Sequence, residues 1–131
     1  MEWVISCNLK YYDVRGAFAK LNRLDWKQSN KNMAVNDIVY IYVGAPYSAI
    51  LYKCLITKVN LAKTTIDDHE FIINGENYEN YGNHMELQLL AVYADDLITK
   101  EKMAELGVKG CIQGPRSVIP ELKAFIDAIE V

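Results

Sequence analysis

Two β-prone runs separated by a short turn constrain the fold of this chain more than any other feature. The first runs from Asp37 to Val43 and the second from Ala49 to Leu61, and both are rich in β-branched and aromatic residues. Residues Gly44 to Ser48, which lie between them, contain a glycine and a proline and favour a reversal of the chain. The pattern predicts two adjacent antiparallel strands.

Three further segments extend the predicted sheet. Glu2 to Cys7 is a short apolar run that ends at the turn former Asn8, so we expect an opening strand there. We also expect a strand in His84 to Tyr93, which alternates apolar and polar residues, and another in Phe71 to Asn74. The sheet should therefore have at least four strands.

Helices are predicted in the sequence both before and after the two long β-prone runs. The first has an apolar face with spacings of three and four, made by Tyr11, Val14, Phe18 and Leu21, and Asp13 could cap it. A polar stretch from Lys27 to Asn36 follows and is expected to be a loop.

Two more helices are predicted near the end of the chain. Thr99 is a good N-cap for a short helix that Gly107 could close in the left-handed conformation. Pro120 suits the first turn of a last helix. The apolar stripe of that helix consists of Leu122, Phe125, Ile126 and Ile129.

Length and composition predict a single α+β domain over residues 1–131. The chain has 51% hydrophobic and 24% charged residues, which is typical of a globular protein. No apolar run approaches the roughly 18 residues that a membrane helix needs. The three cysteines are widely spaced and set among apolar residues, so reduced thiols and a cytoplasmic protein are expected. They are Cys7, Cys54 and Cys111.

Charge is unevenly distributed along the chain. The net charge is -3, which does not by itself indicate nucleic-acid binding. Between Lys10 and Lys31, however, six basic residues face only two acidic ones, Asp13 and Asp25, whereas residues 64 to 99 contain acids and no Lys or Arg. One side of the protein could therefore be basic, although a solvated helix face and an acidic loop would give the same pattern.

No catalytic or metal-binding motif is present. His69 and His84 are far apart, without CxxC or HxxxH spacing, and both are expected at the surface or in loops. Neither a nucleophile elbow nor a phosphate-binding glycine loop occurs. The adjacent acids Asp67 with Asp68 and Asp95 with Asp96 are typical of solvated loops. We therefore expect neither an enzyme nor a bound metal or other cofactor.

Aromatic residues are the most suggestive functional feature. Nine tyrosines and two tryptophans are many for 131 residues, and such side chains combine a flat stacking surface with a polar group. About half of them are expected to fill the core, with Tyr40, Tyr42 and Tyr52 as candidates on strands. The rest are candidates for a recognition pocket.

Several segments, in the same order, resemble the EVE domain of the PUA-like superfamily. They are Trp3 to Asn8, Trp26 after the first helix, Asn36 to Tyr42 in place of that family's Gly-Asp strand, and Ala49 to Val59. The stretch from Gly110 to Arg116 is similar to that of EVE-like domains attached to restriction-type nucleases.

This resemblance implies a partly closed β-barrel of about five to six strands with flanking helices, which reads a modified or flipped base in DNA or RNA. Its pocket would lie between the first strand, the loop carrying the second tryptophan and the barrel strands. The implied ligand-binding residues are Trp3, Ser6, Asn8, Trp26, Tyr42 and Tyr47. Lys10, Lys27 and Arg116 would hold the flanking phosphates.

The chain also departs from the family pattern. Asn36 replaces the expected glycine, and Val4 and Ile5 replace a lysine-rich opening. Trp3 could equally be a core anchor, and Gln113 to Arg116 a turn before the last helix. Three functions stay open: a nucleic-acid reader with an associated nuclease domain, an enzyme acting on a small molecule or RNA on the same barrel, and a protein-interaction domain.

Overall fold

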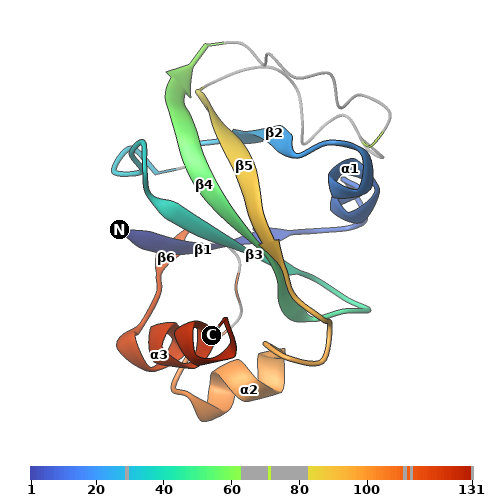
Figure 1. Ribbon diagram of the computed structural model, residues 1–131, viewed down its shortest axis with the longest axis vertical. Coiled ribbons are helices and arrows are strands. Elements are labelled where there is room, and N and C mark those ends of the chain that lie inside the picture. Colours follow the sequence, from blue (N-terminus) through green and yellow to red (C-terminus); the bar gives the residue numbers. More distant parts are fainter. Residues whose placement is uncertain (29, 63–70, 72–82, 111, 113, 131) are drawn as a thin grey trace.

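A computed structural model describes residues 1–28, 30–62, 71, 83–110, 112 and 114–130. Within these ranges the chain forms a mixed sheet with three short helices around it (Figure 1). The strands are β1 (Glu2–Cys7), β2 (Arg23–Lys27), β3 (Ile38–Val43), β4 (Ala49–Leu61), β5 (His84–Val92) and β6 (Arg116–Ser117). The helices are α1 (Val14–Lys20), α2 (Lys100–Glu105) and α3 (Pro120–Ile129).

The strands form one six-stranded sheet in the order β2-β5-β4-β3-β1-β6. β3, β4 and β5 are antiparallel neighbours, as the two long β-prone runs predict, whereas β1 lies parallel to β3. The α+β class and the number of strands are confirmed. The sheet is not closed, however, because β2 and β6 lie at opposite edges and do not pair, so the predicted partial barrel is wrong in that respect.

Besides the two-residue β6, strand β2 was not predicted from the sequence. It pairs antiparallel with β5 and places Trp26 opposite Met85, so Trp26 lies in a strand and not in a loop. Leu24 and Trp26 alternate onto the packed face of the sheet, which is a period-two pattern only five residues long. Asn36, which replaces the glycine of the family pattern, has a φ of 75°. Asn tolerates this left-handed conformation better than most residues.

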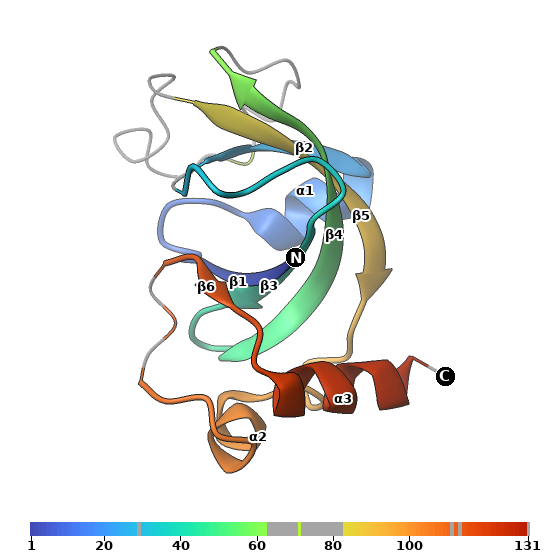
Figure 2. The same ribbon diagram turned by 90° about the vertical axis from the view of Figure 1, so that its left-hand side faces the viewer.

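Hydrophobic residues pack on both faces of the sheet. Helix α1 contributes Val14 and Ala17 to the larger core, which it forms with alternate residues of the central strands. Helices α2 and α3 cover the other face through Met103, Leu122 and Ile126 (Figure 2). Consecutive residues of β1 therefore belong to different cores, as the alternation of side chains along a strand requires.

Helix α1 begins directly after Asp13, the predicted cap. Tyr11 lies in the turn before it, and the Asp13 side chain caps the helix by accepting a hydrogen bond of 3.0 Å from the Gly16 amide. A side chain at Gly16 would meet the Asp13 carboxylate at 2.3 Å and the Phe71 ring at 3.2 Å. Glycine at this position thus allows the cap and the buried Phe71 to approach the helix.

The predicted ends of α2 and α3 are confirmed. Thr99 caps α2 by accepting a hydrogen bond of 3.1 Å from the Lys102 amide, and Gly107 follows it with a φ of 104°. Pro120 opens α3, and Leu122 and Ile126 of its apolar stripe are fully buried. Phe125 and Ile129 pack beside them and are partly buried.

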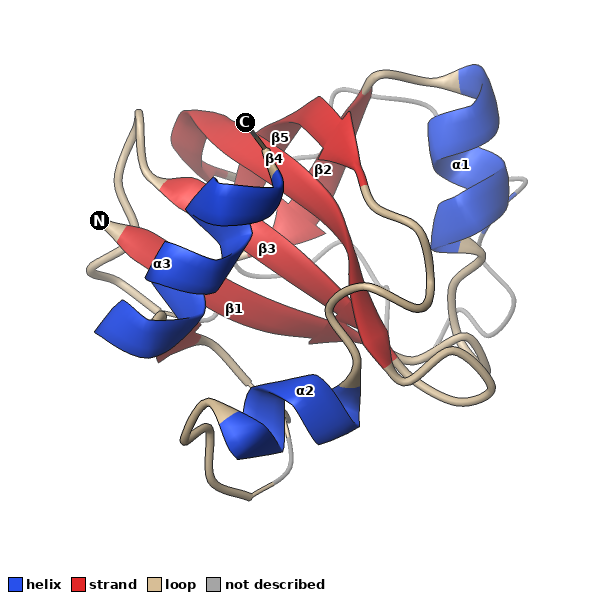
Figure 3. Cartoon of the chain, turned by 60° about the horizontal axis from the view of Figure 1, so that its bottom comes forward, coloured by secondary structure: helices blue, strands red, loops and turns tan. Residues whose placement is uncertain are grey.

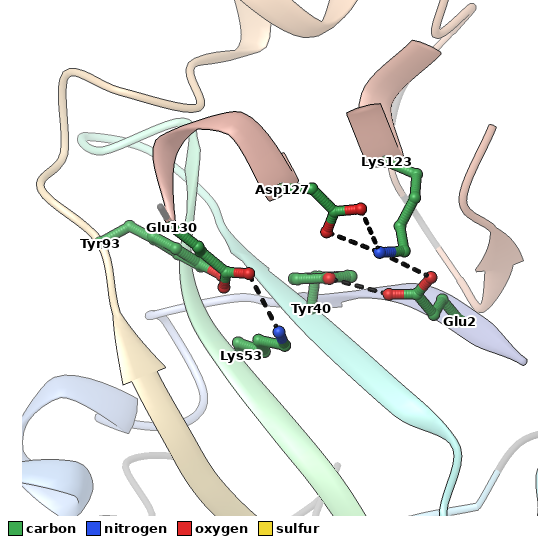
Figure 4. A network of polar contacts seen from close by, with 7 residues as sticks. All are labelled: Glu2, Tyr40, Lys53, Tyr93, Lys123, Asp127 and Glu130. Atoms are coloured by element: carbon green, nitrogen blue, oxygen red, sulfur yellow. Dashed lines mark hydrogen bonds and ion pairs between the residues drawn. The ribbon is translucent and has the colours of Figure 1, made fainter. Parts of the chain in front are cut away.

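A network of polar contacts attaches α3 to the sheet (Figure 4). At one end, the Tyr40 hydroxyl donates to Glu2 at 2.9 Å, and the Lys123 ammonium lies 3.6 Å from the same carboxylate. Lys123 also pairs with Asp127 within α3, at 2.5 Å. At the other end, Glu130 accepts hydrogen bonds from the hydroxyl of Tyr93 and from the ammonium of Lys53.

Several predictions concern residues outside the described ranges. The predicted strand Phe71 to Asn74 lies outside them apart from Phe71, and so do His69, Cys111 and Gln113. Cys7 and Cys54 are buried thiols, as expected. Burial raises the pKa of the Cys54 thiol to about 12, which keeps it protonated and unreactive at neutral pH. No helix in the described ranges is long and apolar enough to cross a membrane.

Candidate functional site

Trp3, the first residue of the predicted pocket, lies in the core. Only 4% of its surface is exposed, and its indole Nε1 donates a hydrogen bond of 3.0 Å to the Asp37 carboxylate. Asp37 also accepts from the Ala34 amide and pairs with the N-terminal ammonium of Met1. Trp3 is thus placed as an anchor between β1 and the start of β3, the alternative that the sequence left open.

Ser6 and Tyr42 lie on the opposite face of the sheet from Trp3. They are partners in the β1–β3 register, and Tyr42 packs against the core beneath α2 and α3. Asn8 is exposed in the turn after β1, where its side chain accepts a hydrogen bond of 2.9 Å from the Lys10 amide. The structure therefore separates these three residues from Trp3.

Trp26 lies on the α1 side of the sheet, as Trp3 does, but it is only partly buried. Its indole contacts the buried Tyr12 edge to face, with ring centroids 5.7 Å apart. The six predicted ligand residues therefore do not form one pocket, because the sheet itself lies between two groups of them.

Tyr47 is the predicted residue that the structure places in an open polar pocket. The turn from Gly44 to Ser48 carries it towards α1, where the guanidinium of Arg15 lies over its ring at 4.5 Å from the centroid. Arg15 also donates a hydrogen bond to the Tyr47 hydroxyl. Arg15 is exposed on α1, so the stacked pair lies at the protein surface.

Residues from three elements surround this pair and enclose a cavity of about 270 Å³. The Tyr52 ring packs against Phe18 of α1, with centroids 4.8 Å apart, and Val92 lies opposite Tyr52 in the β4–β5 register. We call this cavity the Arg15–Tyr47 pocket. Its lining consists of Arg15, Tyr47, Leu51, Tyr52, Val92, Tyr93, Ala94 and Asp95.

The electrostatics of the pocket favour binding over proton transfer. The hydrogen bond with Tyr47 raises the pKa of Arg15, which is already a permanent cation. Burial raises the pKa of Tyr52, although the neighbouring Arg15 acts in the opposite direction. Both groups therefore stay protonated at neutral pH, so the pocket offers the fixed positive charge of Arg15 beside the neutral phenol of Tyr52, with the side chain of Asp95 also in its lining.

The sequence did not indicate Arg15, Tyr52 or Val92 as site residues. Arg15 falls between the apolar positions Val14 and Phe18 of the predicted helix, and that position is the available signal. A planar cation on the exposed face of a helix can stack on an aromatic residue from a neighbouring turn. Tyr52 and Val92 carry no such signal, because the pairing of β4 with β5 brings them together.

The predicted phosphate-binding residues lie in separate places. Lys10 is exposed in the loop before α1, with its ammonium 5.7 Å from the centre of the Tyr11 ring. Lys27 is exposed at the end of β2. Arg116 belongs to β6 at the far edge of the sheet, and its guanidinium donates a hydrogen bond of 2.9 Å to the Lys109 carbonyl. Arg116 therefore stabilises a loop and does not lie with the other two.

The segment from residue 10 to residue 31 nevertheless gives a basic surface. All of its six cations are exposed, whereas its two acids point inward: Asp13 caps α1, and Asp25 is 92% buried. The exposed cations are Lys10, Arg15, Lys20, Arg23, Lys27 and Lys31. The exposed charged side chains of this segment are therefore all cationic, and Arg15 is the one that lines the Arg15–Tyr47 pocket.

A second polar cluster lies at the other end of the sheet. Glu86 of β5 is buried, accepts a hydrogen bond of 2.8 Å from Thr57, and lies 3.6 Å from the cationic groups of both Arg23 and Lys58. His84 is also buried in β5, so the expectation that it lies at the surface is wrong. Within the described ranges, no group of three or more His, Cys, Asp or Glu residues could hold a metal ion.

Comparisons with known proteins identify the fold. No family model and no curated protein matches the sequence. Among solved structures, ASCH from Zymomonas mobilis is similar with a TM-score of 0.65 and 10% identity, over 98% of this chain and 94% of that one. A protein from Pseudomonas syringae has a TM-score of 0.66 and one from Pseudomonas putida 0.64, each at 15% identity over the full length of both chains. The chain therefore has the fold of an ASCH domain, a PUA-like fold related to that of EVE domains, and the EVE family itself is not confirmed.

Proposed function

We propose that this chain is a binding module for single-stranded nucleic acid that receives one unpaired base in the Arg15–Tyr47 pocket. The observation that carries the proposal is the exposed guanidinium stacked 4.5 Å above the Tyr47 ring, at the mouth of a cavity of about 270 Å³. A planar cation and an aromatic ring are the groups on which bases stack, and an arginine can also pair with phosphate.

The surroundings of the pocket support this proposal. Arg15 belongs to the exposed basic set between residues 10 and 31, which could follow a phosphate backbone. The PUA-like superfamily, which the sequence resembles, recognises modified or flipped bases. The ASCH-type fold favours RNA as the polymer. Selectivity for a modified base and association with a nuclease domain stay predictions, as does the absence of catalysis.

Fluorescence anisotropy with a labelled eight-nucleotide single-stranded RNA and its DNA counterpart tests the proposal. Stacking of one base on an aromatic ring contributes on the order of 1 to 3 kcal/mol to binding. Tyr47→Ala removes that contact, so its affinity should be at least fivefold weaker. Tyr11→Ala is the matched control, since Tyr11 is also half-buried beneath a cation but lies outside the pocket. We expect its affinity to change less than twofold.

Two results would contradict the proposal. One is an absence of binding to RNA and DNA at low salt by protein whose circular dichroism shows that it is folded. The other is an equal loss of affinity in Tyr47→Ala and Tyr11→Ala, which would indicate general attraction to a basic surface and no base pocket.

A further inference from the structure

A second cavity, of about 340 Å³, lies between the end of β3 and helix α2. Its walls are mainly apolar and come from Met103, Ala104, Val108 and Ile112, with the Tyr42 ring on the strand side. Lys100 and Gly110 complete the lining. Figure 3 shows α2 near this end of the sheet, away from α1. We call this cavity the Tyr42–α2 pocket.

The backbone around this pocket is held in place by contacts of its own. The Val108 amide donates to the Met103 carbonyl at 2.9 Å, which closes α2, and the side chain of Met103 is buried. The guanidinium of Arg116 holds the Lys109 carbonyl through a hydrogen bond. The space beside Gly110 is open, since a Cβ there would meet nothing within 4 Å. The cavity is therefore formed before any ligand arrives, which lowers the cost of binding.

Two polar groups at the pocket have no partner within the described part of the chain. The Lys100 ammonium forms no ion pair there, whereas Lys102, on the same helix, pairs with Glu105 and lies over Phe125. The Tyr42 hydroxyl likewise makes no hydrogen bond to a described residue, although its ring is half-buried. A cation and a phenol thus face an otherwise apolar cavity.

We propose that the Tyr42–α2 pocket binds a flat aromatic group that carries one anionic substituent. The Tyr42 ring and the Met103 thioether suit an aromatic surface, and the volume is that of a small-ligand site. Lys100 supplies the charge that complements the anion. This proposal does not depend on nucleic-acid binding, because the two pockets share no lining residue.

The fluorescent probe anilinonaphthalene sulfonate, which is both aromatic and anionic, tests this site directly. Ala104→Trp places a large side chain on an exposed position of α2 that borders the cavity, so we expect at least a fivefold weaker probe affinity. Lys100→Gln should weaken it by about two- to fivefold, as for an exposed ion pair, and Lys100→Arg should restore it. Circular dichroism establishes that each variant is folded.

Matched variants separate this site from other apolar surface. Leu90→Gln changes an exposed residue on β5, outside the pocket, and should leave probe affinity within about twofold. Competition by uridine monophosphate or by an eight-nucleotide RNA shows whether the aromatic anion that fits is a free nucleotide or part of a strand. Absence of probe binding, or equal binding by the native protein and Ala104→Trp, would overturn the proposal.

Discussion

Tyrosines on the two faces of the sheet have different surroundings. On the α3 side, the buried Tyr40 and Tyr93 donate their hydroxyl groups to Glu2 and Glu130. Burial, together with these carboxylates, raises the pKa of both phenols far above the usual value. On the α1 side, Tyr47 instead accepts a hydrogen bond from Arg15 at the edge of an open cavity.

The difference shows how one residue type serves two purposes. A tyrosine whose hydroxyl is satisfied by a carboxylate of a covering helix holds that helix to the sheet. Where a tyrosine lies beneath an exposed guanidinium, part of the ring and part of the guanidinium stay available to a ligand. We therefore expect substitutions on the α3 side to change stability and substitutions on the α1 side to change binding.

The largest effect should follow from a cavity beneath α3. Ile126 is fully buried between α3 and the sheet, so Ile126→Ala should lower the free energy of unfolding by about 3 kcal/mol. Urea denaturation measures this change. On the α1 side, Val92→Ala alters a side chain that is 65% exposed and should change stability by less than about 0.5 kcal/mol. A loss for Ile126→Ala as small as that for Val92→Ala would show that α3 contributes little to the core.

A smaller loss of stability is expected when a phenol hydroxyl is removed from the α3 network. Tyr40→Phe deletes a hydrogen bond of 2.9 Å to a carboxylate and should cost about 1.5 kcal/mol. Tyr47→Phe removes a hydroxyl at the surface and should cost less than about 0.5 kcal/mol. Thermal denaturation of both variants compares the two faces directly. A larger loss for Tyr47→Phe would reverse the assignment of roles.

Removing a positive charge should weaken RNA binding on the α1 side of the sheet and leave it unchanged on the α3 side. Arg15→Gln should weaken RNA binding by roughly five- to tenfold and reduce the salt dependence of the affinity by about one phosphate contact. Lys123→Gln removes a partly exposed cation from the α3 network and should leave affinity unchanged. Anisotropy titrations between about 50 and 200 mM salt provide both quantities. Equal slopes for Arg15→Gln and the native protein would exclude a phosphate contact by Arg15.

The smallest effect concerns acid stability at Trp3 and Asp37. Burial alone would raise the pKa of Asp37, but hydrogen bonds from Trp3 and the Ala34 amide, with the N-terminal ammonium, lower it below the usual 3.8. Asp37 therefore stabilises the fold above that pH, and this contribution is lost as the pH falls through the lower folded-state value. In Trp3→Phe, the melting temperature should be lower at neutral pH and should fall less between about pH 5 and 2. An unchanged pH dependence would show that the indole does not stabilise the ionised carboxylate.

Much of the fold could be predicted from local signals. β4 begins and ends where its apolar run does. Thr99 precedes α2 and Pro120 begins α3, because capping and backbone chemistry act within a few residues. Strand β2 was missed because Arg23–Lys27 offers only two inward apolar residues, and its pairing with β5 depends on a distant part of the chain. The open sheet was likewise not predictable, because closure depends on how β2 and β6 lie at its two edges.

The site was predictable only in part. Tyr42 and Tyr47 were both selected and each lines a pocket, but the pockets differ because the turn after β3 carries Tyr47 to the other side of the sheet. Trp3 was selected for its aromatic ring, yet its indole N–H is satisfied by Asp37, a contact that links β1 to β3. Residue type thus indicates the kind of chemistry, whereas the strand register decides which residues share a site.

Chemical-shift mapping shows most directly whether RNA binds in the Arg15–Tyr47 pocket. A ¹H–¹⁵N spectrum of the labelled protein is recorded during titration with a four-nucleotide single-stranded RNA. If RNA binds there, we expect the largest shifts at the Arg15 side chain, in Gly44 to Ser48 and in Val92 to Asp95. The signals of α3 should not change. Shifts confined to α3 and the residues around Glu2 and Tyr40, or no shifts at millimolar RNA, would contradict this prediction.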